Sequence, residues 1–260
     1  MKDRSLDTAV KDSKAPAIAR AAAILRLLGH SEVPMGLQPI ARELGLVPST
    51  CLYVLRALVE EELVSLDPAT KRYSLGSGVL SLARHRLQRD PFASLAQPVL
   101  ADLASRFAVT CIGVEISGLE RITAVAVAEG PGNFRLSTEV GSRFPALLSA
   151  TGRCIAAFGD HALERLRPRF EKLRWDNPPD FALWSEQVLE TRAQGYAADV
   201  GHYIAGVTVM AAPVYRTSES PSHALVALAL SRTLDEEARL RLGKALVEGA
   251  QTVTRQLGNM

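Results

Sequence analysis

The sequence predicts an α+β protein of two domains: a small domain of short helices with one hairpin, followed by a larger domain in which helices flank an antiparallel sheet. Two observations predict this class. Between residues 37 and 58, apolar residues recur twice at helical spacing, on either side of a glycine. After residue 91, short runs of alternating apolar residues are separated by helical stretches and tight turns. A chain of 260 residues has room for two such cores.

The first helix is expected to begin near Pro16 and to end at Gly29. It follows a polar stretch, residues 1–15, that we expect to be disordered. Its apolar face should consist of Ile18, Ala21, Ala22, Leu25 and Leu28. A loop over residues 31–36 then leads to the next helix.

Two short helices joined by a tight turn form the centre of the first domain. Residues 37–44 form the first helix, and Gly45 ends it because glycine tolerates the left-handed conformation. Pro48 begins the second helix, and the hydroxyls of Ser49 and Thr50 are expected to cap its first turn. Its apolar stripe consists of Cys51, Val54, Leu55 and Leu58. This is helix-turn-helix geometry, whose second helix enters the DNA major groove; a plain helical hairpin is the alternative.

A predicted hairpin follows the two helices. Over residues 63–75 the apolar period changes from helical to alternating, with an Asp-Pro turn in the middle. Lys71 and Arg72 lie at the tip of this hairpin, beside the second helix. A basic hairpin in this place predicts a winged helix-turn-helix domain over residues 16–76. The alternative reading of the two cations is a solvated turn.

Residues 77–90 are predicted to form a linker helix between the domains. One face carries the apolar residues, which are Val79, Leu82, Ala83 and Leu87. The opposite face carries Arg84, Arg86 and Arg89, and an Asp-Pro pair ends the helix. A helix of this kind can also pair with a neighbouring subunit.

The second domain is expected over residues 91–260. It should begin with a helix at 92–107 and a hairpin made of 109–116 and 121–128. The remaining elements are a strand at 134–140, helices at about 150–158, 160–173 and 184–194, strands at about 195–199, 206–214 and 223–231, and a terminal helix from Leu234 to about Leu257.

Composition and charge exclude several classes of protein. The net charge is only +2, although residues 1–90 hold 13 basic and 10 acidic residues, a weak basic excess. Three scattered cysteines and five histidines show neither a disulfide framework nor metal-ligand spacing, so we expect no cofactor and no metal. The polar start is not a secretory signal, and no stretch approaches the roughly 20 apolar residues of a membrane span. We therefore expect a cytoplasmic protein with no membrane partner.

Motifs along nearly the whole chain resemble the IclR family of transcriptional regulators. The motifs are AAAILRLLG, then IARELGL followed two residues later by Ser-Thr, then RYSLG, VGSRFPALLSATGRCIAAF, RAQGYAAD and GVTVMAAPV. The resemblance implies a GAF-like effector-binding domain in the second half, and a dimer or dimer of dimers on double-stranded DNA. It also implies a small organic acid as effector, aromatic acids included.

Two departures from the family pattern bear on function. Pro48 and Tyr53 stand where the family usually has basic residues, so we expect fewer phosphate contacts and a weaker salt dependence. In the second domain, Leu147 and His202 stand where a histidine and a glutamate are usual, which bears on the identity of the effector.

The candidate DNA contacts lie on the two short helices and on the wing. The candidates are Gln38, Pro48, Ser49, Thr50, Tyr53, Arg56, Lys71 and Arg72. Gln38 begins a helix and is placed to hold a phosphate, while Tyr53 can donate to phosphate or pack on a thymine methyl group. Arg56 has an alternative role in an ion pair with Glu60, four residues later.

The candidate effector contacts come from the resemblance, carried onto matching positions. They are Gly141, Pro145, Ser149, Thr151, Gly152, Asp199, His202, Tyr203 and Ala205. Residues 149–153 open a helix, whose free N–H groups suit a small carboxylate, and the apolar residues Leu148, Met210 and Leu228 are expected to line the remainder of the site. The alternative is that Ser149 or Thr151 only caps this helix. His202 is either a ligand donor or an exposed polar residue.

The sequence therefore predicts a ligand-responsive transcriptional regulator that binds a near-palindromic operator as a dimer or tetramer. One alternative is an enzyme that processes a small acid with Cys154 or His202. The apolar neighbours of Cys154 favour a buried, inert thiol, and no acid–base pair stands at a fixed spacing. The other alternative is a DNA-binding protein whose sensor domain is vestigial.

Overall fold

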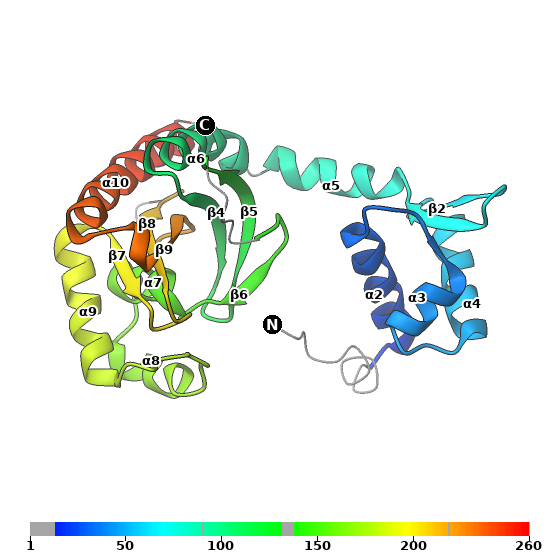
Figure 1. The fold of residues 1–260 in the computed structure, drawn as a ribbon, viewed down its shortest axis with the longest axis horizontal. Coiled ribbons are helices and arrows are strands. Elements are labelled where there is room, and N and C mark those ends of the chain that lie inside the picture. The colour runs from blue at the N-terminus through cyan, green and yellow to red at the C-terminus, as the bar shows by residue number, and fades with distance from the viewer. Residues whose placement is uncertain (1–13, 90, 132–137, 218, 260) are drawn as a thin grey trace. The chain divides into compact units, whose positions relative to one another are not determined.

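A computed structural model describes residues 14–89, 91–131, 138–217 and 219–259 (Figure 1). The chain separates into two compact units, Met1–Arg89 and Asp90–Met260, and each unit has its own buried core. All but the last two residues of the tail that we expect to be disordered lie outside the described residues.

Three helices surround the core of the first unit. They are α2 (Pro16–His30), α3 (Leu37–Glu43) and α4 (Pro48–Glu60). One fully buried residue from each helix, Ile24, Ile40 and Leu55, lies in the same apolar cluster. The expected stripe of α4 is buried along its length. The helix-turn-helix prediction is thus confirmed.

The turn between α3 and α4 depends on Gly45. Its φ is +63°, a left-handed conformation that costs glycine little. The N–H of Leu46 then donates to the carbonyl of Ala41 at 2.8 Å, which satisfies a carbonyl at the end of α3.

The buried face of α2 differs from the one we expected. Ala23, Ile24 and Leu28 are buried, whereas Ile18 is 71% exposed. The reason is that only the C-terminal half of α2 reaches the core, so the apolar residues of its first turns remain outside. The helix also continues through Gly29 to His30.

A three-stranded antiparallel sheet completes the first unit. Its order is β1-β3-β2, with β1 (Met35–Gly36), β2 (Val64–Asp67) and β3 (Arg72–Leu75). The β2–β3 hairpin confirms the predicted wing. The strand β1 lies where we expected a loop, and Met35 pairs with Tyr73. Two residues are too few to show an alternating pattern in the sequence.

The helix α5 (Gly78–Arg89) forms where a helix was predicted, but its expected apolar face is not buried. Val79 and Ala83 are half-buried, whereas Leu80 and Leu82 are 73% and 69% exposed. The described core of the first unit does not extend to these leucines. The predicted contributions of Leu87, Arg86 and Arg89 lie outside the described side chains.

The second unit is built on a six-stranded antiparallel sheet of order β6-β5-β4-β9-β8-β7. The strands are β4 (Thr110–Ser117), β5 (Arg121–Glu129), β6 (Arg143–Pro145), β7 (Ala197–Val200), β8 (Val207–Val214) and β9 (His223–Leu230). The helices are α6 (Phe92–Phe107), α7 (Ser149–Phe158), α8 (Leu163–Phe170), α9 (Phe181–Gln194), the short 3-10 helix η1 (Ser231–Thr233) and α10 (Glu236–Gly258). This confirms the predicted antiparallel sheet flanked by helices.

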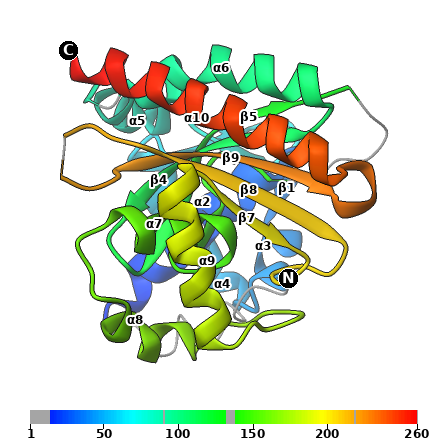
Figure 2. The same cartoon turned by 90° about the vertical axis from the view of Figure 1, so that its left-hand side faces the viewer.

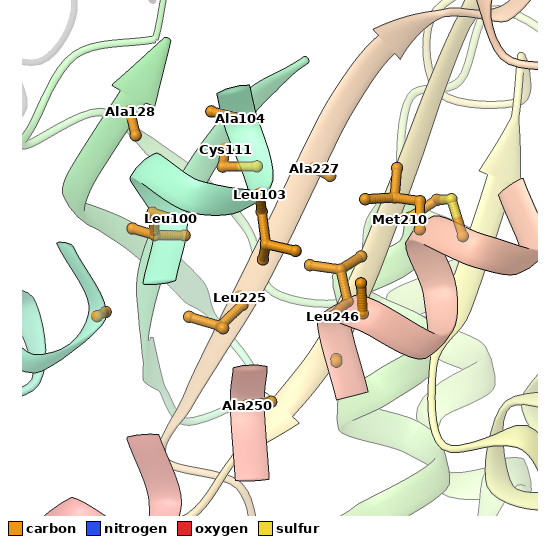
Figure 3. Close-up of a cluster of buried hydrophobic side chains, with 14 of the residues drawn as sticks. Leu100, Leu103, Ala104, Cys111, Ala128, Met210, Leu225, Ala227, Leu246 and Ala250 are labelled. Atoms are coloured by element: carbon orange, nitrogen blue, oxygen red, sulfur yellow. The ribbon is translucent and has the colours of Figure 1, made fainter. Parts of the chain in front are cut away.

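Helices cover both faces of this sheet, with α6 and α10 on one side and α7 and α9 on the other (Figure 2). Successive side chains along a strand point to opposite faces. Cys111, Met210 and Leu225 pack against α6 and α10 in one core (Figure 3). Their neighbours Ile112 and Val226 belong to the second core, with α7 and α9.

The strand predicted at 134–140 is not found in the part of it that the structure describes. Residues 134–137 of the expected strand at 134–140 lie outside the described residues, and residues 138–140 are not extended into a strand. The described edge strand is β6, in which Phe144 pairs with Ile122. No described helix is both long and apolar enough to cross a membrane.

Candidate DNA-binding surface and effector cavity

The helix α4 presents a polar face opposite its buried stripe. Ser49, Tyr53 and Arg56 are all exposed on this face, and Tyr53 has 76% of its surface open. Their spacing of four and then three residues places them along one side of the helix. The helix therefore offers a hydroxyl, a phenol and a guanidinium group to a partner.

The start of α4 differs from our expectation. Val47 occupies the N-cap position without a side-chain hydrogen bond, and Pro48 is the first helical residue. Ser49 and Thr50 therefore lie inside the first turn, and their hydroxyls do not cap it. Within the described residues no group accepts the backbone N–H of either residue. These free N–H groups suit a phosphate oxygen.

The two other polar candidates on the helices are also available. Gln38, near the start of α3, is exposed. Among the described residues, Arg56 makes no ion pair with Glu60, so the alternative role that we considered for Arg56 is not present. Both side chains are free to contact a partner.

The tip of the wing is held by Asp67. Its carboxylate accepts the N–H of Ala69 at 2.9 Å and the hydroxyl of Thr70 at 2.6 Å, and the Thr70 bond is the main cause of its lowered pKa. Lys71 follows in a left-handed conformation, φ +55°, and is exposed. Arg72 donates to the carbonyl of Pro34 at 3.2 Å, so this cation also anchors the wing to the loop before β1.

A cavity in the second unit lies between the sheet and the start of α7. Its lining residues are Ile112, Ile122, Phe144, Leu148, Ser149, Thr151, Tyr203, Val209, Val226 and Leu228. The cavity is narrow, because only about 40 Å³ is open to the centre of a water molecule. Seven of the ten lining residues are aliphatic or aromatic hydrocarbons, and the other three carry hydroxyls.

Ser149 is the most unusual residue of this cavity. Its φ is +58°, and its buried Oγ has no hydrogen-bond partner within the described part of the chain. A buried hydroxyl without a partner costs about 1–3 kcal/mol, so such groups are rare. Leu148 is the N-cap of α7 and makes no side-chain hydrogen bond, so neither Ser149 nor Thr151 caps the helix. A ligand with a polar atom would satisfy Ser149.

Tyr203 brings a phenol to the cavity from the loop after β7. Burial raises its pKa, with a smaller contribution from Asp176. The phenol therefore stays protonated at neutral pH and can donate a hydrogen bond.

The structure brings together four of the predicted effector contacts, which are Leu148, Ser149, Thr151 and Tyr203, along with the expected Leu228. Gly141, Pro145 and Ala205 are exposed and do not line the cavity. Gly152 is buried and does not line the cavity; only glycine fits there, because an added Cβ would lie about 2.1 Å from the backbone of Leu147.

Three predictions in this domain differ from what is found. Met210 packs among α6 and α10, since the strand alternation turns Val209 rather than Met210 toward the cavity. Asp199 is fully buried and bound by Arg153, so it does not line the cavity. His202 is half-buried and does not line the cavity, and among the described residues its Nδ1 has no hydrogen-bond partner.

The residues that sequence reasoning missed are mostly strand residues of the cavity wall. Ile112 faces Val226 across β4 and β9, and Val209 faces Leu228 across β8 and β9. The alternating pattern of these strands could have grouped them on one face. Arg153 and Gln187 were also missed, although Arg153 donates to Gln187 from two of its nitrogens.

The Cys154 thiol has the character of a core residue. It is buried, donates to the carbonyl of Ala211 at 3.2 Å, and has a pKa raised by burial to about 12. A thiol of this kind is not a nucleophile at neutral pH. The described residues contain no group of three or more histidine, cysteine or acidic side chains placed to hold a metal ion.

Two family models match the chain. The model for the bacterial transcriptional regulator IclR C-terminal domain matches residues 84–255, and the model for the IclR helix-turn-helix domain matches residues 17–68.

A curated relative matches along nearly the whole chain. The chain is 33% identical over 248 residues to the glycerol operon regulatory protein of Streptomyces coelicolor, covering 93% of this chain and 96% of the relative.

Solved structures match as well. An IclR transcriptional regulator from Alicyclobacillus acidocaldarius has a TM-score of 0.74 at 29% identity, covering 95% of this chain and 100% of that chain. An IclR homolog from Microbacterium hydrocarbonoxydans, solved with 4-hydroxybenzoate, has a TM-score of 0.73 at 18% identity, covering 94% and 100%. The latter is a likeness of fold alone.

Proposed function

The chain belongs to the IclR family of bacterial transcriptional regulators, and from this premise we propose that a small organic acid in the cavity beside α7 controls its affinity for a near-palindromic DNA operator. Its helix-turn-helix and effector domains make it a DNA-binding transcriptional regulator rather than an enzyme. The buried, unpartnered Oγ of Ser149 on the cavity wall carries the proposal for the effector.

We place the DNA contacts on α4, on the start of α3 and on the wing. In this proposal Ser49, Tyr53 and Arg56 contact bases or phosphates in the major groove. Gln38 and Lys71 contact phosphates on either side. A dimer or dimer of dimers carries such helices in pairs, which requires half-sites about one helical turn apart.

Selection of bound sequences from a random DNA library tests the DNA half of the proposal. The expected result is a near-palindrome whose half-sites lie about 10 base pairs apart, or a multiple of that spacing. Enrichment of a single, asymmetric half-site would contradict binding as a symmetric dimer.

The chemistry of the cavity supports a small organic acid. Free N–H groups at the start of α7 and the helix dipole favour an anion, while the apolar wall favours a hydrocarbon body. The complex of an IclR homolog with 4-hydroxybenzoate supports the same class. Because the cavity is narrow, an aromatic ring must push apart side chains such as Phe144.

Glycerol is a second candidate effector. A relative at 33% identity is named for a glycerol operon, and three residues that carry hydroxyls, Ser149, Thr151 and Tyr203, line the cavity. Three hydroxyls around one cavity can exchange hydrogen bonds with a polyol.

A thermal-shift titration with 4-hydroxybenzoate, benzoate and glycerol separates these candidates. We expect a saturable rise in melting temperature with an acid, because a ligand that binds only the folded state stabilises it. The same titration on Ser149→Ala controls for non-specific stabilisation by glycerol. A saturable shift with glycerol alone would favour the second candidate, and no shift with a wide panel of acids and polyols would favour a vestigial sensor.

A further inference from the structure

We propose that Arg153 and Asp199 are positioning residues of the effector cavity: their buried ion pair holds the loop at residues 201–206 in place, and its cancelled charge allows the cavity to accept an acid. This inference, which rests on the proposed effector site, assigns Asp199 a role that needs no contact with the effector.

The pair is isolated from solvent. Both side chains are 0% exposed, and Nη1 of Arg153 lies 2.9 Å from Oδ2 of Asp199. Burial lowers the pKa of Arg153, and the neighbouring carboxylate of Asp199 opposes this change. The guanidinium therefore stays charged, as arginine does in proteins. Neither residue lines the cavity.

Asp199 organises the loop that carries one wall of the cavity. Its second oxygen, Oδ1, accepts the backbone N–H of His202 at 3.0 Å and that of Tyr203 at 3.2 Å. Tyr203 lines the cavity. The carboxylate therefore fixes the backbone from which this phenol projects.

Arg153 connects the same loop to two helices. It lies on α7, two residues after Thr151, which lines the cavity. Its Nε and Nη2 donate to Oε1 of Gln187 on α9, at 2.8 Å and 2.6 Å. One guanidinium group thus joins α7, α9 and the loop, so the walls of the cavity are held relative to one another.

Other hydrogen bonds hold the loop through different atoms. The carbonyls of Tyr203 and His202 accept the N–H groups of Asp176 and Asn177, at 3.2 Å and 3.0 Å. The N–H of Ala205 donates to Oδ2 of Asp176 at 2.9 Å, and the side-chain amide of Asn177 donates to the carbonyl of Gly201 at 2.7 Å. Loss of Asp199 should therefore release the amides of His202 and Tyr203 in particular, while the ends of the loop stay bound.

The charge of the pair has a separate consequence. An unpaired carboxylate beside the cavity would repel an acidic ligand, because charges interact strongly in a medium of low polarity. Arg153 cancels this charge. The variant Asp199→Asn leaves an uncompensated guanidinium, which should favour an acid over its neutral amide. If Asp199→Asn only disturbed the structure of the cavity, it would weaken the binding of the acid and of the amide alike.

Amide hydrogen exchange on the ligand-free, full-length protein tests the anchoring. In Asp199→Ala we expect exchange at His202 and Tyr203 to accelerate by about tenfold or more, because the one oxygen that accepts both N–H groups, Oδ1 of Asp199, is lost. Asp199→Asn keeps an oxygen acceptor and should stay close to wild type. The matched control, Asp176→Ala, should accelerate Ala205 instead. Unchanged exchange at His202 and Tyr203 in Asp199→Ala would overturn the anchoring role.

Binding of 4-hydroxybenzoate and of 4-hydroxybenzamide tests the charge. We expect Asp199→Asn to raise the ratio of acid affinity to amide affinity about three- to tenfold, and the neutral double variant Arg153→Met/Asp199→Asn to restore the wild-type ratio. An unchanged ratio in Asp199→Asn would overturn the charge role. If wild type binds neither compound, the proposed effector class fails, whereas the exchange experiment still decides the anchoring.

Discussion

At the scale of single residues, Ser149 carries two unfavourable features at once. A left-handed backbone is rare outside glycine, and a buried hydroxyl without a partner costs free energy. Such features are retained at functional sites, where a ligand completes them. The same residue opens α7 and lines the cavity.

Ser149→Ala should therefore have opposite effects on stability and on binding. Without ligand, we expect the free energy of unfolding to rise by about 1 kcal/mol, because the unpartnered hydroxyl is removed. With the effector, we expect the affinity to fall about tenfold through loss of one hydrogen bond. Urea unfolding and ligand titration measure the two quantities.

Ser185→Ala is the matched control for this change. Its hydroxyl already donates to the carbonyl of Phe181 at 2.7 Å, so its removal should not stabilise the protein and should leave effector affinity unchanged. Lower stability of Ser149→Ala than of wild type would show that Oγ has a partner in solution.

Cys154 makes stability depend on pH in the alkaline range. Its pKa is about 12 in the folded protein and 9.0 in an unfolded chain, so the folded state keeps its proton longer. This contribution is fully present below pH 9 and is lost as the pH rises from 9 toward 12. We expect Cys154→Ala to lose less stability than wild type between pH 8 and about 10.5, measured by thermal unfolding. Equal losses would contradict a buried thiol.

The sequence predicted several residues of the cavity lining but not the buried ion pair of Arg153 and Asp199. Ser149 and Thr151 both line the cavity, and their place in the first turn of a helix was predictable because a helix start is readable from local residues. Arg153 was missed because its burial depends on Asp199, a residue 46 positions away that no local pattern reveals. Met210 was misplaced by one residue of strand alternation, which turns a side chain to the other face.

At the scale of elements, α4 and the wing carry exposed side chains, which are the proposed DNA contacts. The buried stripe of α4 fixes the helix in the core, so its polar face can change without loss of folding. This separation of roles makes the DNA contacts testable one residue at a time.

Tyr53 tests the recognition helix. Because it is 76% exposed, we expect Tyr53→Ala to change the free energy of unfolding by less than about 0.5 kcal/mol. Operator affinity should fall about tenfold, as for loss of one base contact worth about 1–3 kcal/mol. Tyr53→Phe keeps the ring and removes the hydroxyl, so it separates their contributions to operator affinity. Unchanged operator affinity in Tyr53→Ala, measured by fluorescence anisotropy, would remove Tyr53 from the interface.

Lys71 tests the wing. Lys71→Gly relieves a left-handed conformation and should leave stability unchanged or raised by up to about 1 kcal/mol. If Lys71 contacts a phosphate, the slope of log affinity against log salt should become shallower by about 0.9. Glu62→Gly, which also replaces a left-handed residue, is the control and should not make this slope shallower. An unchanged slope in Lys71→Gly would leave Lys71 as a solvated turn residue.

Element length decided which elements were predictable. The long helices and the strands of the central hairpin show their periods clearly, and they were predicted within a few residues of their bounds. The strands β1 and β6 have two and three residues, too few for any period, and they form only because β3 and β5 offer free edges for pairing.

At the scale of the whole molecule, regulation requires coupling between two compact units. A ligand can shift an equilibrium only if it binds one state better than the other. In the proposed mechanism the effector must therefore favour either the DNA-binding arrangement of a dimer or another arrangement. By thermodynamic reciprocity, operator DNA then changes effector affinity by the same factor.

The most direct test is operator affinity measured across a full titration of the effector found by thermal shift. We expect the affinity to change by about 5- to 150-fold, the range of typical coupling free energies, with a midpoint that follows effector occupancy. Ser149→Ala should shift this midpoint to higher concentration while leaving effector-free operator affinity unchanged. Equal operator affinity at every effector concentration would contradict ligand control of DNA binding by this chain.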